Sequence, residues 1–202
     1  MTTHFHFHPL AEIFPLMSDD EFQRLCDDIR ENGQREPIWL HQNKIIDGRN
    51  RYNACQVLGI EPSVREWNGI GSLISFVVSL NLHRRHLSES QRAMVAAKLA
   101  NMRQGERTDL KDFPPIGGRL SQTEASKLLN VSERSVQRAG KVLAEGVSEL
   151  TEKVESGEIT VSRAEQIAQL PKTKQIRLIQ KGREKGQKIL NDLKIRSLKK
   201  TV

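Results

Sequence analysis

The stretch IIDGRNRYNAC (45–55) contains the end of an expected strand, a turn and the start of an expected helix. Gly48 lets the backbone approach an anion closely, and the following helix N-terminus adds N–H donors. Arg49 and Arg51 carry forked donors that suit phosphate oxygens. The pattern therefore predicts a phosphate-binding turn. A structural turn with solvated arginines is the alternative.

The segments around this turn predict a small unit of mixed strands and helices. Ser18 and Ser88 each begin a capping pattern at the start of an apolar helical repeat. The expected elements are a helix over 18–33, strands at 37–41 and 44–47 with a turn at 42–43, a short helix closed by Gly59, a strand within 61–67, and helices over 72–82 and 88–103. Cys26 and Cys55 fall on apolar faces, which predicts buried thiols.

The N-terminal HFHFH (4–8) alternates as a strand does, with its phenylalanines on one face and its histidines on the other. We expect the histidines to face solvent. A metal site is the alternative, made by His4, His6 and His8.

Charge is distributed unevenly along the chain. Residues 1–150 hold 19 basic and 19 acidic side chains, whereas 151–202 hold 13 basic and 6 acidic, which accounts for the whole net charge of +7. A basic end favours contact with a polyanion such as nucleic acid. The sequence has no signal peptide and no apolar run of about 18 residues, so we expect a cytoplasmic, nucleoid- or plasmid-associated protein without membrane contact.

Residues 120–143 (LSQTEASKLLNVSERSVQRAGKVL) predict a helix-turn-helix. Two serines in capping positions, Ser121 and Ser132, start two short helices, and apolar residues at helical spacing lock them together. The second helix exposes polar and basic side chains near its N-terminus, the part that enters the major groove of DNA. The predicted DNA-binding residues are Ser121, Gln122, Thr123, Ser132, Arg134, Ser135, Gln137 and Arg138. An ordinary helical hairpin is the alternative.

Three motifs in order resemble the ParB family: ENGQREPIWL (31–40), IIDGRNRYNA (45–54) and SLNLHRRHLSESQRA (79–93). The resemblance covers roughly residues 5–100 and implies an α+β chain. The expected chain has a small mixed ParB/sulfiredoxin-like domain over 1–103 and a linker over 104–119. An all-α helix-turn-helix and helical-bundle domain over 120–185 and a basic tail over 186–202 follow. The family's separate C-terminal dimerisation domain has no counterpart in this sequence, which suggests a truncated chain or a short family member.

The resemblance also implies a site for CTP with magnesium. Carried over by position, its residues are Gly33, Pro37, Gly48, Arg49, Asn50, Arg51, Asn81, Arg84 and Arg85, with Asn81 also implied for magnesium. The chain departs from the family at Arg49 and Leu80, where a glutamate is usual, and at Asn50, where an arginine is usual. Nucleotide identity and hydrolysis by a CTPase activity therefore stay open.

The implied function is site-specific DNA binding in plasmid or chromosome partition, or related regulation, switched by a nucleoside triphosphate. Double-stranded DNA, a homodimer and a partition ATPase are the implied partners. A transcriptional repressor with a degenerate N-terminal domain and a ParB-like nuclease are the alternatives, but Asp47 alone supplies no two-metal site. Sulfiredoxin chemistry is disfavoured because it needs a cysteine within the turn, whereas Cys55 lies in the apolar part of the following helix.

Overall fold

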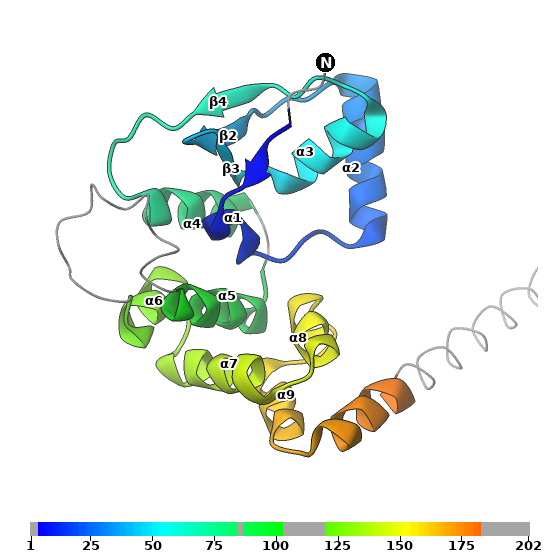
Figure 1. Cartoon of the computed structure of the whole chain (residues 1–202), viewed down its shortest axis with the longest axis vertical. Coiled ribbons are helices and arrows are strands. Elements are labelled where there is room, and N and C mark those ends of the chain that lie inside the picture. The colour runs from blue at the N-terminus through cyan, green and yellow to red at the C-terminus, as the bar shows by residue number, and fades with distance from the viewer. Residues whose placement is uncertain (1–3, 85–86, 103–119, 183–202) are drawn as a thin grey trace, which may run out of the picture.

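The computed structural model describes residues 4–84, 87–102 and 120–182, apart from the side chains of His83 and Arg84. The predicted linker and basic tail and Arg85 lie outside these residues. Within them the fold is α+β, as predicted: a small mixed sheet with helices around it in one half, and helices alone in the other (Figure 1). No helix in the described ranges is long and apolar enough to span a bilayer.

The sheet has the strand order β1-β3-β2-β4. Its members are β1 (His6–Phe7), β2 (Ile38–His41), β3 (Lys44–Asp47) and β4 (Val64–Glu66). β2 and β3 form an antiparallel hairpin, whereas β1 runs parallel to β3 and β4 runs parallel to β2. Gln42 and Asn43 both have positive φ in the hairpin turn, the geometry that matches the right-handed twist of the two strands.

Helices cover the sheet and bury its apolar residues. They are α1 (Pro9–Glu12), α2 (Asp19–Asn32), α3 (Arg49–Leu58) and α4 (Leu73–Arg84). Cys26 and Ile29 of α2 pack against Ala54 and Cys55 of α3, so both thiols are buried as predicted. Burial raises the pKa of Cys55, which keeps this thiol in its unreactive protonated form.

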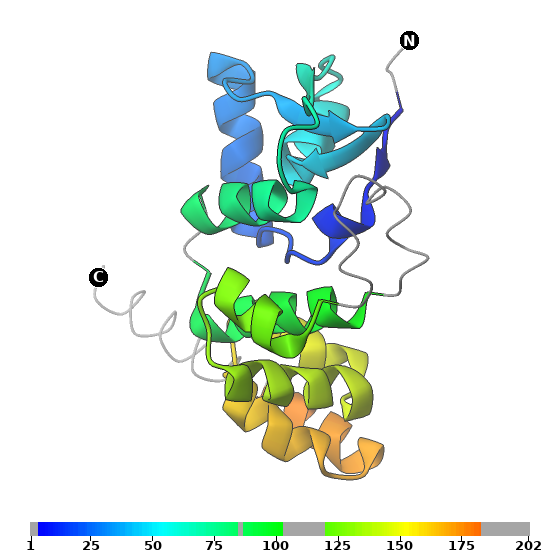
Figure 2. The ribbon, with the colours of Figure 1, turned by 90° about the vertical axis from the view of Figure 1, so that its left-hand side faces the viewer.

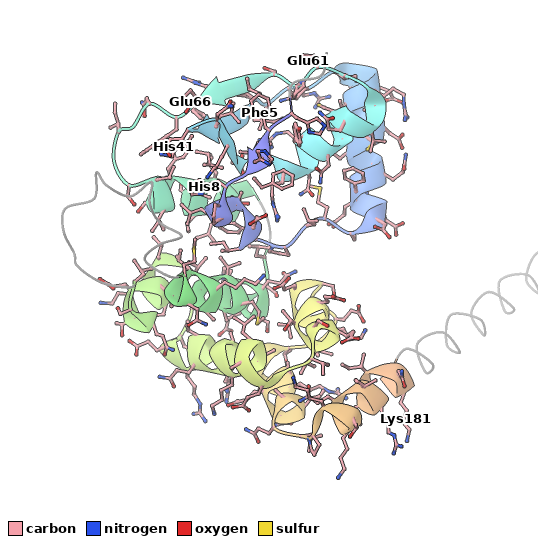
Figure 3. The ribbon with its side chains drawn as sticks, viewed as in Figure 1. Phe5, His8, His41, Glu61, Glu66 and Lys181 are labelled. Atoms are coloured by element: carbon pink, nitrogen blue, oxygen red, sulfur yellow. The ribbon has the colours of Figure 1, made fainter. Side chains whose placement is uncertain are left out.

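The expectation of solvent-facing histidines is wrong for His8. Its side chain is only 3% exposed, and its Nδ1 accepts a hydrogen bond from the backbone N–H of Leu10, which caps the short helix α1. Figure 3 shows His8 beside His41, and their ring centroids lie 6.3 Å apart. Strand β1 is therefore only two residues long, because the chain turns into α1 where the alternating pattern predicted a longer strand.

The other half consists of helices packed on one another (Figure 2). They are α5 (Glu89–Asn101), α6 (Gln122–Leu128), α7 (Glu133–Glu145), α8 (Ser148–Glu155) and α9 (Val161–Ala168), followed by a helical segment over 172–182. The sequence groups α5 with the N-terminal domain, yet α5 packs against α6, α7, α8 and α9. By these contacts α5 belongs to the helical half. The predicted boundary between the domains at residue 103, which follows α5, stays a prediction.

Candidate nucleotide and nucleic-acid sites

The turn between β3 and α3 is built around Gly48. This residue is the N-cap of α3, has φ +98° and supplies no side-chain cap for the first-turn N–H groups. A Cβ atom at this position would lie 3.0 Å from Nη2 of Arg51 and 3.2 Å from Cγ1 of Ile38. Only glycine fits this turn without strain, because its backbone conformation is left-handed and its Cα is closely surrounded.

A buried polar network lies beside the turn. Asp47 accepts hydrogen bonds from Nη2 of Arg51 at 3.0 Å and from Nδ2 of Asn81 at 3.3 Å. Arg51 also donates to the carbonyl of Pro37 at 3.1 Å, and Asn81 donates to the carbonyl of Val77 at 2.9 Å. The network joins β3, α3 and α4, so residues of the motifs at 45–54 and 79–93 meet in space.

The network lines a pocket of about 200 Å³. The lining residues are Met17, Leu25, Asp47, Gly48, Asn50, Arg51, Leu80 and Asn81. Pockets that enclose a drug-sized ligand measure roughly 300–1,000 Å³. This pocket can therefore enclose a phosphate group and its neighbours, while the remainder of a nucleotide would lie outside it.

Two buried N–H groups at this pocket have no hydrogen-bond partner among the described residues: Nδ2 of Asn50 and Nε of Arg51. Oδ1 of Asn50 accepts from the backbone N–H of Met17 at 3.5 Å, which orients the amide. Buried donors in folded proteins are nearly always paired, so two unpaired donors on residues that line one pocket require an acceptor that the described residues do not supply. A phosphate oxygen is the acceptor that these donors and the neighbouring helix N-terminus suit.

Three of the remaining predicted nucleotide residues, Gly33, Pro37 and Arg49, do not line the pocket. Arg49 donates to the backbone carbonyl of Phe14 and is not part of the pocket lining. Gly33 is exposed at the C-cap of α2, and Pro37 contributes its carbonyl to Arg51. The side chain of Arg84 and all of Arg85 lie outside the described residues.

The pocket does not fit a magnesium site at Asn81. The amide nitrogen of Asn81 is directed at Asp47 and Val77, and both carboxylate oxygens of Asp47 accept hydrogen bonds from Arg51 or Asn81. Magnesium requires oxygen ligands, and Asp47 is the single carboxylate in the described lining of the pocket. The sequence offered Asp47 as a lone carboxylate that supplies no two-metal site, and the structure makes it the partner of Arg51.

The second predicted site lies on α6 and α7. Ser121 caps α6 through a reciprocal capping box with Glu124, and Ser132 caps α7. Between the two helices Asn130 adopts a positive φ of 50°, which allows the chain to turn within a few residues. The predicted DNA-binding residues Gln122 and Thr123 lie in the first turn of α6, the former exposed and the latter half-buried.

The first turns of α7 divide into an exposed and a buried part. Arg134 and Gln137 are exposed. Ser135 is only 6% exposed, and its hydroxyl lies 2.9 Å from that of Ser132 and donates to Oε1 of Glu89 at 2.9 Å. The side chain of Ser135 thus holds α7 against α5, so we leave it out of the DNA-contacting set.

Arg138 and Lys141 of α7 both bind Glu165 of α9. Nε of Arg138 lies 3.1 Å from Oε2, and Nζ of Lys141 lies 2.8 Å from Oε1. The hydrogen bond from Lys141 and the charges of Lys141, Arg138 and Arg134 lower the pKa of Glu165, outweighing the opposite effect of its desolvation. Sequence reasoning missed Lys141, although this lysine shares a helix face with Arg134 and Arg138. It also missed Glu165, because no local sequence pattern links α7 to α9.

No protein-family model and no curated protein matches the chain. Among solved structures it is similar to the C-terminally truncated chromosome-partitioning protein ParB from Caulobacter crescentus in two complexes. The one with CTP-γ-S shows 22% identity over 82% of this chain and 87% of that chain, with a TM-score of 0.29. The one with the centromeric parS site shows 20% identity over 85% and 83%, with a TM-score of 0.36.

A third similar structure is a Pnob8-like ParB-N domain, with 19% identity over 81% of this chain and 74% of that chain and a TM-score of 0.46. The three similar structures are thus ParB proteins, the family that the sequence motifs resemble. Matches at these identities and TM-scores carry no argument about function, which therefore rests on the residues described above.

Proposed function

We propose that the chain is a site-specific DNA-binding protein of the ParB type, acting in plasmid or chromosome partition or in related regulation. A nucleoside triphosphate bound near Gly48 switches its arrangement, and α7 reads the DNA. A homodimer and a partition ATPase are the partners that this function implies. The observation that carries the proposal is the pair of unpaired donors, Asn50 Nδ2 and Arg51 Nε, at a pocket beside a helix N-terminus.

The DNA-binding half of the proposal rests on α7. Its apolar side is buried through Val136, Ala139 and Val142, which fixes the helix on the protein. Its opposite side presents Arg134 and Gln137 close to the N-terminal end. Arginine and glutamine are side chains that form paired hydrogen bonds with guanine and adenine in the major groove. These two residues are therefore the proposed base-reading pair.

The test of this half begins with selection of bound sequences from a random duplex library. Arg134→Ala and Gln137→Ala are each expected to weaken binding to the selected site by about 1–3 kcal/mol and to relax selection at one base position. Arg30→Ala is the matched control, because it removes an exposed arginine from α2. Recovery of no preferred sequence, or equal losses in Arg30→Ala, would refute site-specific reading by α7.

The nucleotide half is tested with Asn50→Asp. This substitution keeps the shape of the side chain, removes the unpaired Nδ2 donor and places negative charge at the pocket. It does not disfavour α3, because an acidic residue in the first turn of a helix is compatible with the helix dipole. We expect binding of labelled CTP, with ATP and GTP as competitors, to weaken at least about tenfold, because a charge-assisted hydrogen bond is worth about 1.5–3 kcal/mol.

Asn53→Asp is the matched control for this measurement, since it adds the same charge on the same helix without lining the pocket. Equal binding by wild type and Asn50→Asp, or an equal loss in Asn53→Asp, contradicts a phosphate at this turn. If the wild type binds no nucleotide with or without DNA, the protein is a repressor-like DNA-binding protein whose N-terminal domain has another role.

A further inference from the structure

Three cations of α7 form one row, which we call the α7 basic row: Arg134, Arg138 and Lys141. Residues four and seven positions apart share one face of a helix. Arg134 is exposed, the side chain of Lys141 is 52% exposed and that of Arg138 is 28% exposed. The row continues the surface of Arg134 and Gln137, so a duplex seated on these two residues brings its phosphates near the whole row.

One carboxylate holds two of these cations. Oε2 of Glu165 lies 3.1 Å from Nε of Arg138, and Oε1 lies 2.8 Å from Nζ of Lys141. The side chain of Glu165 is 16% exposed, so it is the least exposed member of the group. A phosphate that approaches Arg138 or Lys141 therefore shares these cations with a carboxylate of the same charge sign, which repels it and partly neutralises their charge.

We propose that Glu165 is a specificity-determining residue, which competes with DNA phosphates for Arg138 and Lys141 and so weakens sequence-independent binding. The inference rests on the proposed function, because it takes α7 as the DNA-binding helix. Non-specific affinity arises almost entirely from phosphate contacts, whereas base contacts supply sequence selection. Glu165 pairs with two of the cations that would contact phosphates, whereas Arg134 and Gln137 stay exposed for base contacts. It therefore weakens non-specific binding more than sequence selection.

A purely structural role for the Glu165 cluster is the competing explanation. An ion pair that keeps one partner in water, as the 52% exposed Lys141 does here, contributes about 0–1 kcal/mol to stability. The contact between α7 and α9 is already secured by buried apolar residues, among them Ala139 and Val142 of α7 and Ala164 and Ala168 of α9. Glu165 can therefore be changed without loss of the fold, and its effect on DNA binding can be measured directly.

The test compares full-length wild type, Glu165→Gln and Glu152→Gln on a duplex of scrambled sequence, by fluorescence anisotropy between about 50 and 200 mM salt. Glu165→Gln is expected to bind more tightly at low salt. Its plot of log affinity against log salt is expected to steepen by about 0.9 for each additional phosphate contact, and thus by up to about 1.8. Preference for the selected site over scrambled DNA falls accordingly.

Glu152→Gln controls for net charge, because it removes an exposed carboxylate from α8. An unchanged slope in Glu165→Gln, an equal steepening in Glu152→Gln, or weaker binding by Glu165→Gln overturns the proposal. The last result would make Glu165 a positioning residue for Arg138. If wild type binds no duplex at any salt concentration, the proposed DNA-binding function fails, and the inference fails with it.

A second variant tests the same competition without altering Glu165. Lys141→Gln in the wild-type background is expected to flatten the slope by much less than about 0.9, because Glu165 already neutralises this lysine. In the Glu165→Gln background the same change is expected to flatten it by about 0.9. Equal effects in the two backgrounds would show that Glu165 does not compete for Lys141.

Discussion

Replacing Gln175 with alanine is expected to lower the free energy of unfolding of the helical half by about 2–5 kcal/mol. Gln175 lies in the last described helical segment and is only 1% exposed. Its Oε1 accepts from the backbone N–H of Val147 at 2.9 Å. Its Nε2 donates to the carbonyls of Glu145, Ala168 and Leu170. The side chain therefore satisfies backbone groups at the ends of α7 and α9 and at the start of α8. Alanine removes this partner from all of them, including the buried carbonyl of Ala168.

The measurement is urea unfolding followed by far-ultraviolet circular dichroism. Gln175→Met separates the two causes of the loss, because methionine restores much of the volume but none of the hydrogen bonds. We expect Gln175→Met to recover less than half of the lost stability. Gln180→Ala, on an exposed glutamine of the same segment, is expected to change stability by less than about 0.5 kcal/mol. Wild-type stability in Gln175→Met would show that only packing matters at this position.

The sequence predicted the local structure well because its signals are local. The capping serines Ser18, Ser88, Ser121 and Ser132 all occupy N-cap positions, and each accepts a hydrogen bond from a backbone N–H three residues later. Apolar periodicity placed the hairpin β2–β3 and the helices α2 to α5 near their observed bounds. A cap or a repeat depends on residues within one or two helical turns, so no long-range contact is needed to recognise it.

Contacts between distant segments were beyond sequence reasoning. His8 was expected to face solvent, but the cap that it provides for α1 buries its ring. At the candidate nucleotide site the glycine turn was recognised, whereas the bond from Asn81 to Asp47 spans 34 positions of the sequence. The ion pairs of Glu165 likewise join separate helices. Such pairings are set by tertiary packing, which residue spacing does not encode.

Replacing Asp47 with alanine is expected to have the largest effect in the N-terminal half, a loss of about 3 kcal/mol of unfolding free energy. The side chains of Asp47 and Arg51 are 9% and 19% exposed, and they lie 3.0 Å apart. Alanine at position 47 leaves the guanidinium of Arg51 in a largely buried place with one carbonyl acceptor, that of Pro37. Removing one partner of a buried pair costs more than the pair itself contributes, because an uncompensated charge remains.

Trp39 and Trp67 both lie in or next to the sheet, so tryptophan fluorescence during urea unfolding reports on this half of the chain. Asp27→Ala is the control, since Asp27 forms a similar pair with Arg30 at 2.6 Å, but the two side chains are 48% and 58% exposed. We expect that control to lose less than about 1 kcal/mol.

The double variant Asp47→Ala with Arg51→Ala separates the cost of an isolated charge from the contribution of the pair. We expect it to be destabilised by less than the sum of the two single changes, because neither charge is then left alone. Additive losses would mean that the two side chains do not stabilise each other. Strong coupling means that Asp47 fixes the guanidinium through Nη2, which leaves Nε, without a partner among the described residues, as the donor for a phosphate.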